Sequence, residues 1–169
     1  MNSDNPTGKP RGIFRICAMA AAVTVWLHMP SAAAQSIDDI TLNVYKEITC
    51  ACCVGWIEHM DEHGYESTIF HPANINRVKL DLGLRPQYHS CHTAVTASGY
   101  IFEGHIPEKY IDMFLADPPE NAIGLAVPGM PIGGPGMEIG DRFTPYQILL
   151  LHKDGSARVY AEINSKADQ

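Results

Sequence analysis

The chain has 169 residues, of which 46% are hydrophobic and 18% charged, with 12 basic and 19 acidic residues and a formal net charge of −7. Such an acidic chain repels the phosphates of nucleic acids and of anionic membranes, so we expect neither as a partner. Its charge is compatible with binding cations.

The first 34 residues predict a signal peptide. A basic start leads into the apolar run 16–27, and Ala32 and Ala34 form an A-x-A cleavage site before Gln35. The apolar run is short for a membrane span, so a retained anchor is the weaker alternative. We therefore expect a periplasmic protein, exported and free of the membrane after cleavage. Its single domain, 35–169, has nine basic and 18 acidic residues, which makes its net charge −9.

Four of the five cysteines follow this leader, and three of them stand within four residues. The stretch TCACCVGW contains Cys50, Cys52 and Cys53, and Cys91 follows much later. An even number of cysteines in an exported protein usually indicates disulfides. Adjacent and next-but-one cysteines form strained bridges, however, which argues against a structural disulfide framework. A redox pair and a metal site remain as hypotheses.

The predicted elements follow the order β-α-β-α-β-β-α, with a hairpin added at the C-terminus. Alternating apolar residues predict a strand at 41–47, and Trp56, Ile57 and Met60 give the segment 52–64 a helical apolar face. This order is typical of a thioredoxin-like α/β fold. The later elements are expected at 65–71 (strand), 74–83 (helix), 93–97 and 100–104 (hairpin), 107–117 (helix, opened by a proline), and 146–155 and 156–163 (hairpin).

In a fold of this kind, the first strand ends at the start of the first helix, and the loop before the third strand passes beside it. That loop is YHSCHTAV, so we expect Cys91 to lie close to Cys50, Cys52 and Cys53. The positive end of the helix dipole stabilises thiolates at this place. Four thiols are therefore expected to converge, for electron transfer or for metal binding.

Thiolates are soft ligands that select Cu(I), zinc or iron–sulfur clusters over hard cations. Zinc sites usually space their cysteines by two or more residues, whereas Cys52 and Cys53 are neighbours. Crowded thiolates are better suited to a bridged, multinuclear Cu(I) cluster. A structural module stabilised by zinc is the weakest of the hypotheses considered.

The main competing hypothesis is a periplasmic thiol-disulfide oxidoreductase. The segment 50–53 also contains a C-x-x-C pair at a helix start. Thioredoxin-type enzymes carry a cis-proline in the loop that faces this pair, whereas here His92, preceded by Cys91, takes the corresponding place. A Cys-His pair favours a metal. It does not abolish exchange chemistry, so a copper-linked thiol oxidoreductase remains open.

Four segments, VYKEITCACCVGWIEHM, SCHTAV, GYIFEGHIP and GLAVPGMPIGGPGME, together resemble the CopG-type periplasmic metal-binding family. This family was long described as a domain of unknown function and is associated with copper resistance. The resemblance covers about residues 43–160. It implies a thioredoxin-like fold, export, and copper binding through the C-x-C-C motif, here Cys50, Cys52 and Cys53, together with Cys91. Copper ions and other periplasmic copper-handling proteins are the implied partners, and no catalysis is expected beyond a copper-linked redox change.

Further donors stand near the predicted ligands. His92 adjoins one of them, and His105 lies in the family-like motif FEGHIP. The stretch 126–146 is rich in glycine and proline and is predicted to be a loop. Its Met130 and Met137 are soft Cu(I) ligands in principle. Either this loop folds over the cluster and shields it, or both methionines cover the core.

A histidine pair is predicted on the first helix. His59 and His63 are spaced i to i+4, as in helical metal-binding pairs. Two histidines without a third ligand do not complete a site. A solvated helix face beside Asp61 and Glu62 is therefore the favoured interpretation.

Overall fold

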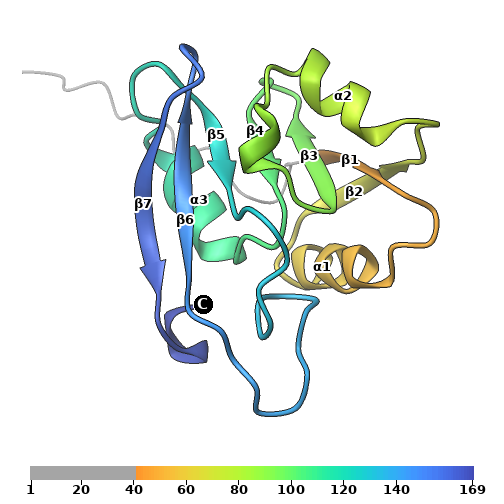
Figure 1. Cartoon of the computed structure of the whole chain (residues 1–169), viewed down its shortest axis with the longest axis vertical. Coiled ribbons are helices and arrows are strands. Elements are labelled where there is room, and N and C mark those ends of the chain that lie inside the picture. The colour runs from red at the N-terminus through yellow and green to blue at the C-terminus, as the bar shows by residue number, and fades with distance from the viewer. Residues whose placement is uncertain (1–40) are drawn as a thin grey trace, which may run out of the picture. The chain divides into compact units, whose positions relative to one another are not determined.

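The computed structural model describes residues 41–169 (Figure 1). The predicted signal peptide and its cleavage site, residues 1–34, lie outside the described residues. Within 41–169, no helix is both long enough and apolar enough to cross a membrane.

Seven strands form one mixed sheet in the order β2-β1-β3-β4-β5-β6-β7. The pairs β1–β2 and β4–β5 are parallel, and the other neighbours are antiparallel. The predicted α/β class and the order β-α-β-α-β-β-α of its first seven elements are confirmed. The strands are β1 (Thr41–Lys46), β2 (Glu66–Phe70), β3 (His92–Thr96), β4 (Ile101–Glu103), β5 (Ala122–Ala126), β6 (Tyr146–His152) and β7 (Ala157–Ile163), and the helices are α1 (Ala51–Glu62), α2 (Ile75–Asp81) and α3 (Glu108–Ala116), with short 3-10 helices η2 (Pro86–Tyr88) and η3 (Lys166–Asp168).

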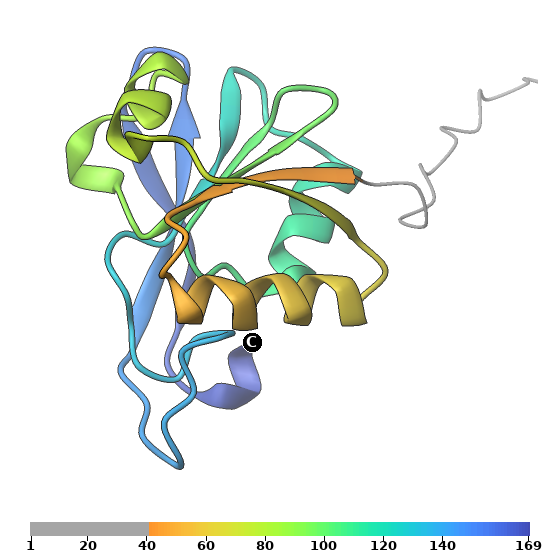
Figure 2. The ribbon, with the colours of Figure 1, turned by 90° about the vertical axis from the view of Figure 1, so that its right-hand side faces the viewer.

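Helices cover both faces of the sheet: α1 and α3 lie on one face, and α2 lies on the other (Figure 2). Helix α1 buries Cys53, Trp56, Ile57 and Met60, which recur at the spacing of one helical face. The indole N–H of Trp56 donates to the Ile106 carbonyl at 2.8 Å. The first turn of α1, which carries the cysteines, is thus held against the sheet by the apolar turns behind it.

Each face of the sheet has its own apolar layer, because successive side chains of a strand point to opposite faces. In β4, Phe102 belongs to the larger cluster with the α1 and α3 side chains, whereas Ile101 packs in a smaller cluster with Leu84. In β6, Leu150 and Leu151 divide in the same way. The sheet is therefore a buried central layer that fixes the strand ends near the cysteines.

Strand β5 was not predicted from the sequence. Its segment AIGLA contains Gly124, which weakens a strand pattern. Gly124 has φ +148°, and a Cβ atom there would overlap the carbonyl of Ile101 on β4. The glycine allows the two backbones to approach. β5 pairs with both β4 and β6, so the predicted C-terminal hairpin extends the same sheet.

The other differences from the predicted elements are small. Pro107 was expected to be the first residue of α3 but stands just before it, with φ −63° and ψ 139°. The stretch that follows β5 is a loop over residues 127–145, as predicted, and it contains one isolated β-bridge, Ile139 with Arg142.

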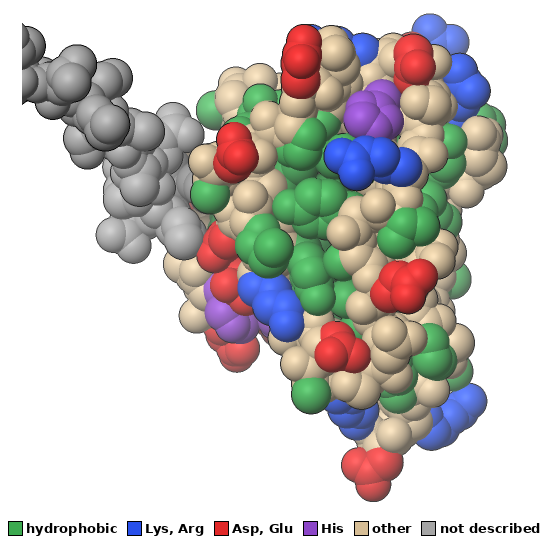
Figure 3. Space-filling model, turned by 90° about the vertical axis from the view of Figure 1, so that its left-hand side faces the viewer, with side chains coloured by type: hydrophobic (Ala, Val, Ile, Leu, Met, Phe, Trp, Pro, Cys, Tyr) green, Lys and Arg blue, Asp and Glu red, His purple; other side chains and the backbone are tan. Residues whose placement is uncertain are grey.

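The face that carries the β6–β7 hairpin presents hydrophobic side chains among acidic and basic ones (Figure 3). On β7, Val159 is exposed, while Tyr160 and Ala161 are half-buried and pack against the larger cluster. β7 is an edge strand of the sheet, and β2 is the other.

Candidate metal centre

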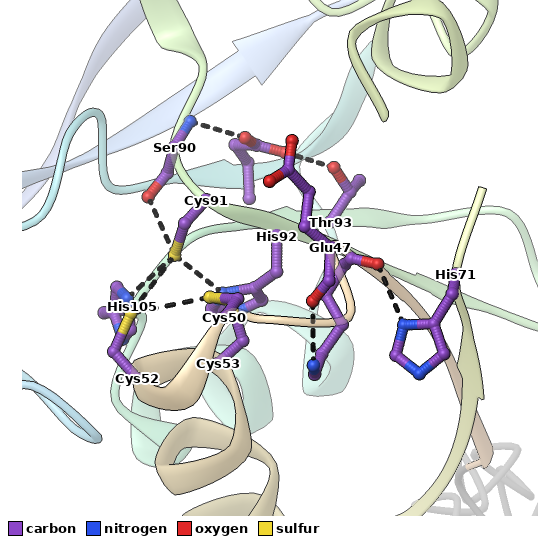
Figure 4. Close-up of a disulfide and its surroundings, with 12 residues drawn as sticks. Glu47, Cys50, Cys52, Cys53, His71, Ser90, Cys91, His92, Thr93 and His105 are labelled. Atoms are coloured by element: carbon purple, nitrogen blue, oxygen red, sulfur yellow. Dashed lines mark hydrogen bonds between the residues drawn. A yellow bond between two sulfur atoms is a disulfide. The ribbon is translucent and has the colours of Figure 1, made fainter. Parts of the chain in front are cut away.

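The four sulfur atoms after the predicted leader converge, although one comes from a distant part of the chain (Figure 4). Cys50 stands at the N-cap of α1, Cys52 and Cys53 lie in its first turn, and Cys91 immediately precedes β3. The Sγ atom of Cys52 is 3.5 Å from that of Cys50 and 3.9 Å from that of Cys91. All four sulfurs lie within 4.8 Å of one another. We refer to these four residues as the four-cysteine cluster.

The cluster contains a disulfide, and this bridge joins the two cysteines of the C-x-x-C pair on which the competing redox hypothesis rests. Cys50 and Cys53 are bridged, and Cys52 and Cys91 are free thiols. The bridged residues are three apart on a helix start, which brings their Cα atoms to 5.4 Å, within the range that disulfides require. Four thiols were expected, whereas two thiols and a disulfide are present. Only reduction of this bridge makes all four sulfurs available as thiolates.

His105 is directed at Cys91 by the loop between β5 and β6. Its Nδ1 lies 2.8 Å from the Pro135 carbonyl oxygen, which only accepts, so Nδ1 carries the proton and donates. The lone pair of Nε2 then faces the Cys91 sulfur at 3.0 Å. Burial lowers the pKa of His105, opposed by the hydrogen bond to Pro135 and by the charge of Glu138. The imidazole is therefore neutral at neutral pH and able to accept a proton or bind a metal.

His92 lies on the other side of Cys91 and is completely buried. Its Nδ1 is 3.4 Å from the Cys91 sulfur, and its ring packs on Trp56 with ring centres 4.4 Å apart. Within the described residues, its Nε2 has no hydrogen-bond partner. Burial, and then His105, lowers the pKa of His92 well below its usual value, so this ring is also neutral. Cys91, His92 and His105 thus form a second donor group that shares one sulfur with the four-cysteine cluster.

Cys91 is a protonated thiol at neutral pH. Burial, and then the adjacent Cys52, raises the pKa of Cys91 to about 12. The sequence predicted a setting that stabilises thiolates, but Cys91 lies before β3 rather than on the helix whose dipole would do so. Its proton leaves most readily when a cation takes its place.

A buried ion pair holds the loop that carries Cys91. Lys79 on α2 and Glu103 on β4 are both fully buried and form a salt bridge. The Glu103 carboxylate also accepts from the Ser90 backbone N–H at 2.6 Å and from the Thr93 hydroxyl at 2.5 Å. Sequence reasoning missed this pair. The available signal was a lysine one turn after the buried Ile75 of α2, on the helix face that should be apolar.

The glycine- and proline-rich loop packs against the start of α1, the helix end that carries the cysteines. A Cβ atom on Gly55 would lie 2.9 Å from the Cα atom of Gly136, and one on Gly136 would lie 2.6 Å from the Cys52 carbonyl. The contacts that dock the loop therefore come from Pro135 and Gly136. Met130 is exposed and Met137 is half-buried, so neither of them is a core residue.

An α/β protein that gathers four sulfurs and two neutral imidazoles at the start of a helix has the donor set of a soft-metal or thiol-redox centre. A protein family described as "Protein of unknown function, DUF411" matches residues 88–137, which include Cys91, His92 and His105. No curated protein sequence matches the chain.

Two solved structures are similar to the chain, and their titles are "Copper resistance protein copG- Form 2" and "Copper resistance protein copG- Form 1". Each is 39% identical, with a TM-score of 0.69, and covers 73% of this chain. The matches extend over 98% and 97% of those chains. The chain belongs to the CopG copper-resistance protein family, which confirms the resemblance found in the sequence.

Proposed function

We propose that this chain is an exported copper-binding protein that holds Cu(I) through the reduced four-cysteine cluster and serves copper resistance. The observation that carries the proposal is the convergence of Cys91 with the C-x-C-C motif from a different part of the fold. Soft thiolates select Cu(I), and sulfurs this crowded are suited to bridging several copper ions. Membership of a copper-resistance family supports the choice of copper.

The neighbouring imidazoles assist this binding. His105 Nε2 is placed to accept the Cys91 proton when the sulfur becomes a ligand, because Pro135 keeps the proton on Nδ1. His92 then offers a nitrogen donor beside Cys91, and His105 offers a second one once its Nε2 has passed this proton on to solvent. Met130 and Met137 are weaker candidates for copper ligands than the cysteines and histidines. They belong to the loop that packs on the start of the same helix, α1.

Copper capacity depends on the oxidation state of the protein. With the Cys50–Cys53 bridge closed, the remaining soft donors are the sulfurs of Cys52 and Cys91. Opening the bridge takes two electrons and two protons and yields two further thiols. A reduced chain should therefore hold more copper than an oxidised one.

A second candidate function is thiol-disulfide exchange. The free sulfur of Cys52 lies 3.5 Å from the Cys50 sulfur of the disulfide, within reach of attack by its thiolate. This geometry favours a redox-active centre as well as a metal centre. The two functions are compatible in one site, and a copper-linked redox change would use both.

The test is copper analysis of the protein purified from the periplasm under anaerobic conditions, together with a count of free thiols. We expect copper to be retained by the reduced protein with at least micromolar affinity, about −8 kcal/mol or better, and to be largely lost on oxidation. Efficient reduction of insulin disulfides by a protein that retains no copper would instead establish the oxidoreductase.

We further propose that residues 1–34 are a cleaved signal peptide and that residues 35–169 form the single periplasmic domain. Copper-handling proteins of the same compartment are then the natural partners. The acidic charge of the mature chain is compatible with attracting cations.

A further inference from the structure

A second group of metal-binding side chains lies outside the four-cysteine cluster. His59 lies in the last turn of α1 and His63 is the C-cap residue of that helix, and both meet Glu108 at the first residue of α3. Each of the three residues offers a ligand atom within 4.8 Å of the other two. The helix pair alone lacked a third ligand. The fold supplies that ligand from another helix.

His63 is oriented as metal-binding histidines usually are. Its Nδ1 lies 2.7 Å from the backbone oxygen of His59, so Nδ1–H donates and the lone pair is on Nε2. That Nε2 atom lies 3.6 Å from a carboxylate oxygen of Glu108. Two ligand atoms that bind one ion at about 2.0–2.1 Å are roughly 3 Å apart, in tetrahedral as in square-planar geometry, so a small side-chain movement would let both atoms bind one ion.

His59 completes the group from the same helix face. Its ring centre is 4.5 Å from that of His63, and its Nε2 accepts a long hydrogen bond of 3.3 Å from the Glu108 backbone N–H. This bond is weak enough to exchange for a metal bond. Burial, and then His63, lowers the pKa of His59, so its ring is neutral and the Nε2 lone pair that accepts this bond is available in exchange to a metal.

The carboxylates beside these histidines lack a permanent cation. Glu108 and Asp112 are one turn apart on α3, and Asp112 accepts a hydrogen bond from the Tyr65 hydroxyl. Among residues 41–169, no lysine or arginine forms a salt bridge with either carboxylate. The charge of Asp112 acts on Glu108, and a cation bound at Glu108 would offset this repulsion.

We propose that His59, His63 and Glu108 form a second metal site, which takes a divalent transition-metal ion and prefers Cu(II). Imidazole and carboxylate are donors for Cu(II) and Zn(II), whereas Cu(I) selects the sulfurs. Cu(II) binds most tightly among the first-row divalent ions at such donors. The two ends of α1 would then serve two oxidation states of one metal. This site stands independently of the proposed function of the four-cysteine cluster.

The test titrates the folded protein with Cu(II) after alkylation of its free thiols, which removes the soft donors. Electron paramagnetic resonance should show one Cu(II) per chain with couplings to imidazole nitrogen, and bound Zn(II) should be displaced by Cu(II). The variants His63→Gln and Glu108→Gln should each weaken binding at least tenfold, while His152→Gln, on β6, should bind as wild type.

Circular dichroism of each variant confirms that it is folded, and the exposed position of His63 makes its substitution the safest probe. Equal affinity of His63→Gln, Glu108→Gln and wild type for Cu(II) would overturn the site and leave a simple histidine–glutamate ion pair. If bound Zn(II) is not displaced by added Cu(II), the proposed preference for Cu(II) is wrong. Because the thiols are blocked, neither result bears on the four-cysteine cluster.

Discussion

Cys91 is the residue on which the two donor groups depend. Its sulfur is the only atom that belongs to both the four-cysteine cluster and the Cys91–His92–His105 group. It is half-buried among uncharged partners, which keeps it protonated in the absence of a metal. A cation that binds there must displace a proton, and His105 is placed to accept it.

The first prediction concerns the pH dependence of copper affinity. The pKa of Cys91 is raised to about 12, so the thiol is protonated throughout the neutral range and each binding event releases at least its proton. Apparent Cu(I) affinity should therefore rise at least tenfold for each pH unit between pH 6 and pH 8, and fall correspondingly towards acid. Competition with a chromophoric Cu(I) chelator measures this slope. An affinity that does not change with pH would mean that Cys91 is not a ligand.

At the level of elements, the position of Cys91 depends on the packing of α2 against β3 and β4. Lys79 and Glu103 are removed from water and satisfied only by each other, by Thr93 and by the Ser90 backbone. Removing one partner of a buried pair leaves an uncompensated charge and destabilises a protein by about 3–5 kcal/mol.

The second prediction follows from this pair. Lys79→Met should lower the free energy of unfolding by about 3–5 kcal/mol, because Glu103 stays buried and charged. The double variant Lys79→Met, Glu103→Gln should recover part of the loss, since the isolated charge is gone. Urea denaturation of the reduced, metal-free proteins provides the comparison. A single variant as stable as wild type would show that water reaches the carboxylate.

The third prediction concerns the docking of the loop over residues 127–145. Gly136 has φ +78°, and a Cβ atom there would overlap the Trp56 backbone nitrogen. Gly136→Ala should therefore displace the loop and break the hydrogen bond between Pro135 and His105. Amide hydrogen exchange should become faster at the start of α1 and in the loop.

Gly140→Ala is the matched control for this variant. Gly140 also has a positive φ, +55°, but nothing lies within 4 Å of a Cβ atom placed there. It should change backbone strain without changing the packing. Equal hydrogen exchange in the two alanine variants would mean that the close approach to α1 does not hold the loop.

The elements that could be predicted from the sequence are those with a regular spacing of apolar residues or with a clear turn signal. Helix α1 carries an apolar face from Cys53 to Met60, and the C-terminal hairpin turns at Asp154 and Gly155, so both were predictable. Strand β5 was not predictable, because Gly124 interrupts its apolar pattern, and the reason for this glycine is the close approach of the β4 backbone. The local sequence of β5 gives no information about which strand lies next to it.

The candidate site divides in the same way. Convergence of Cys91 with the C-x-C-C motif could be predicted because it follows from strand order. The Pro135 carbonyl behind His105, the buried partner of Lys79 and the carboxylate facing His63 could not, since each contact joins segments whose relative positions depend on packing. The Cys50–Cys53 disulfide depends on sulfur geometry and oxidation state, which spacing alone does not determine.

At the scale of the whole molecule, the fourth prediction concerns export. The A-x-A rule places the cut after Ala34, so the mature chain should begin at Gln35. Intact mass measurement of protein from the periplasmic fraction determines the first residue. A chain that keeps residues 1–34 and stays with the membrane would overturn the proposal that the domain is free in the periplasm.

The strand order brings the two parts of the cluster together. β1 and β3 are antiparallel neighbours, so the end of β1, which leads to α1, lies beside the start of β3, which follows Cys91. The most direct test of this account is the Cu(I) stoichiometry of anaerobically reduced wild type and Cys91→Ser, measured side by side. We predict a sharp loss of bound copper in Cys91→Ser, because a bridged cluster loses its closure when one thiolate is removed. Wild-type stoichiometry and affinity in Cys91→Ser would contradict the proposal that these sulfurs form one site.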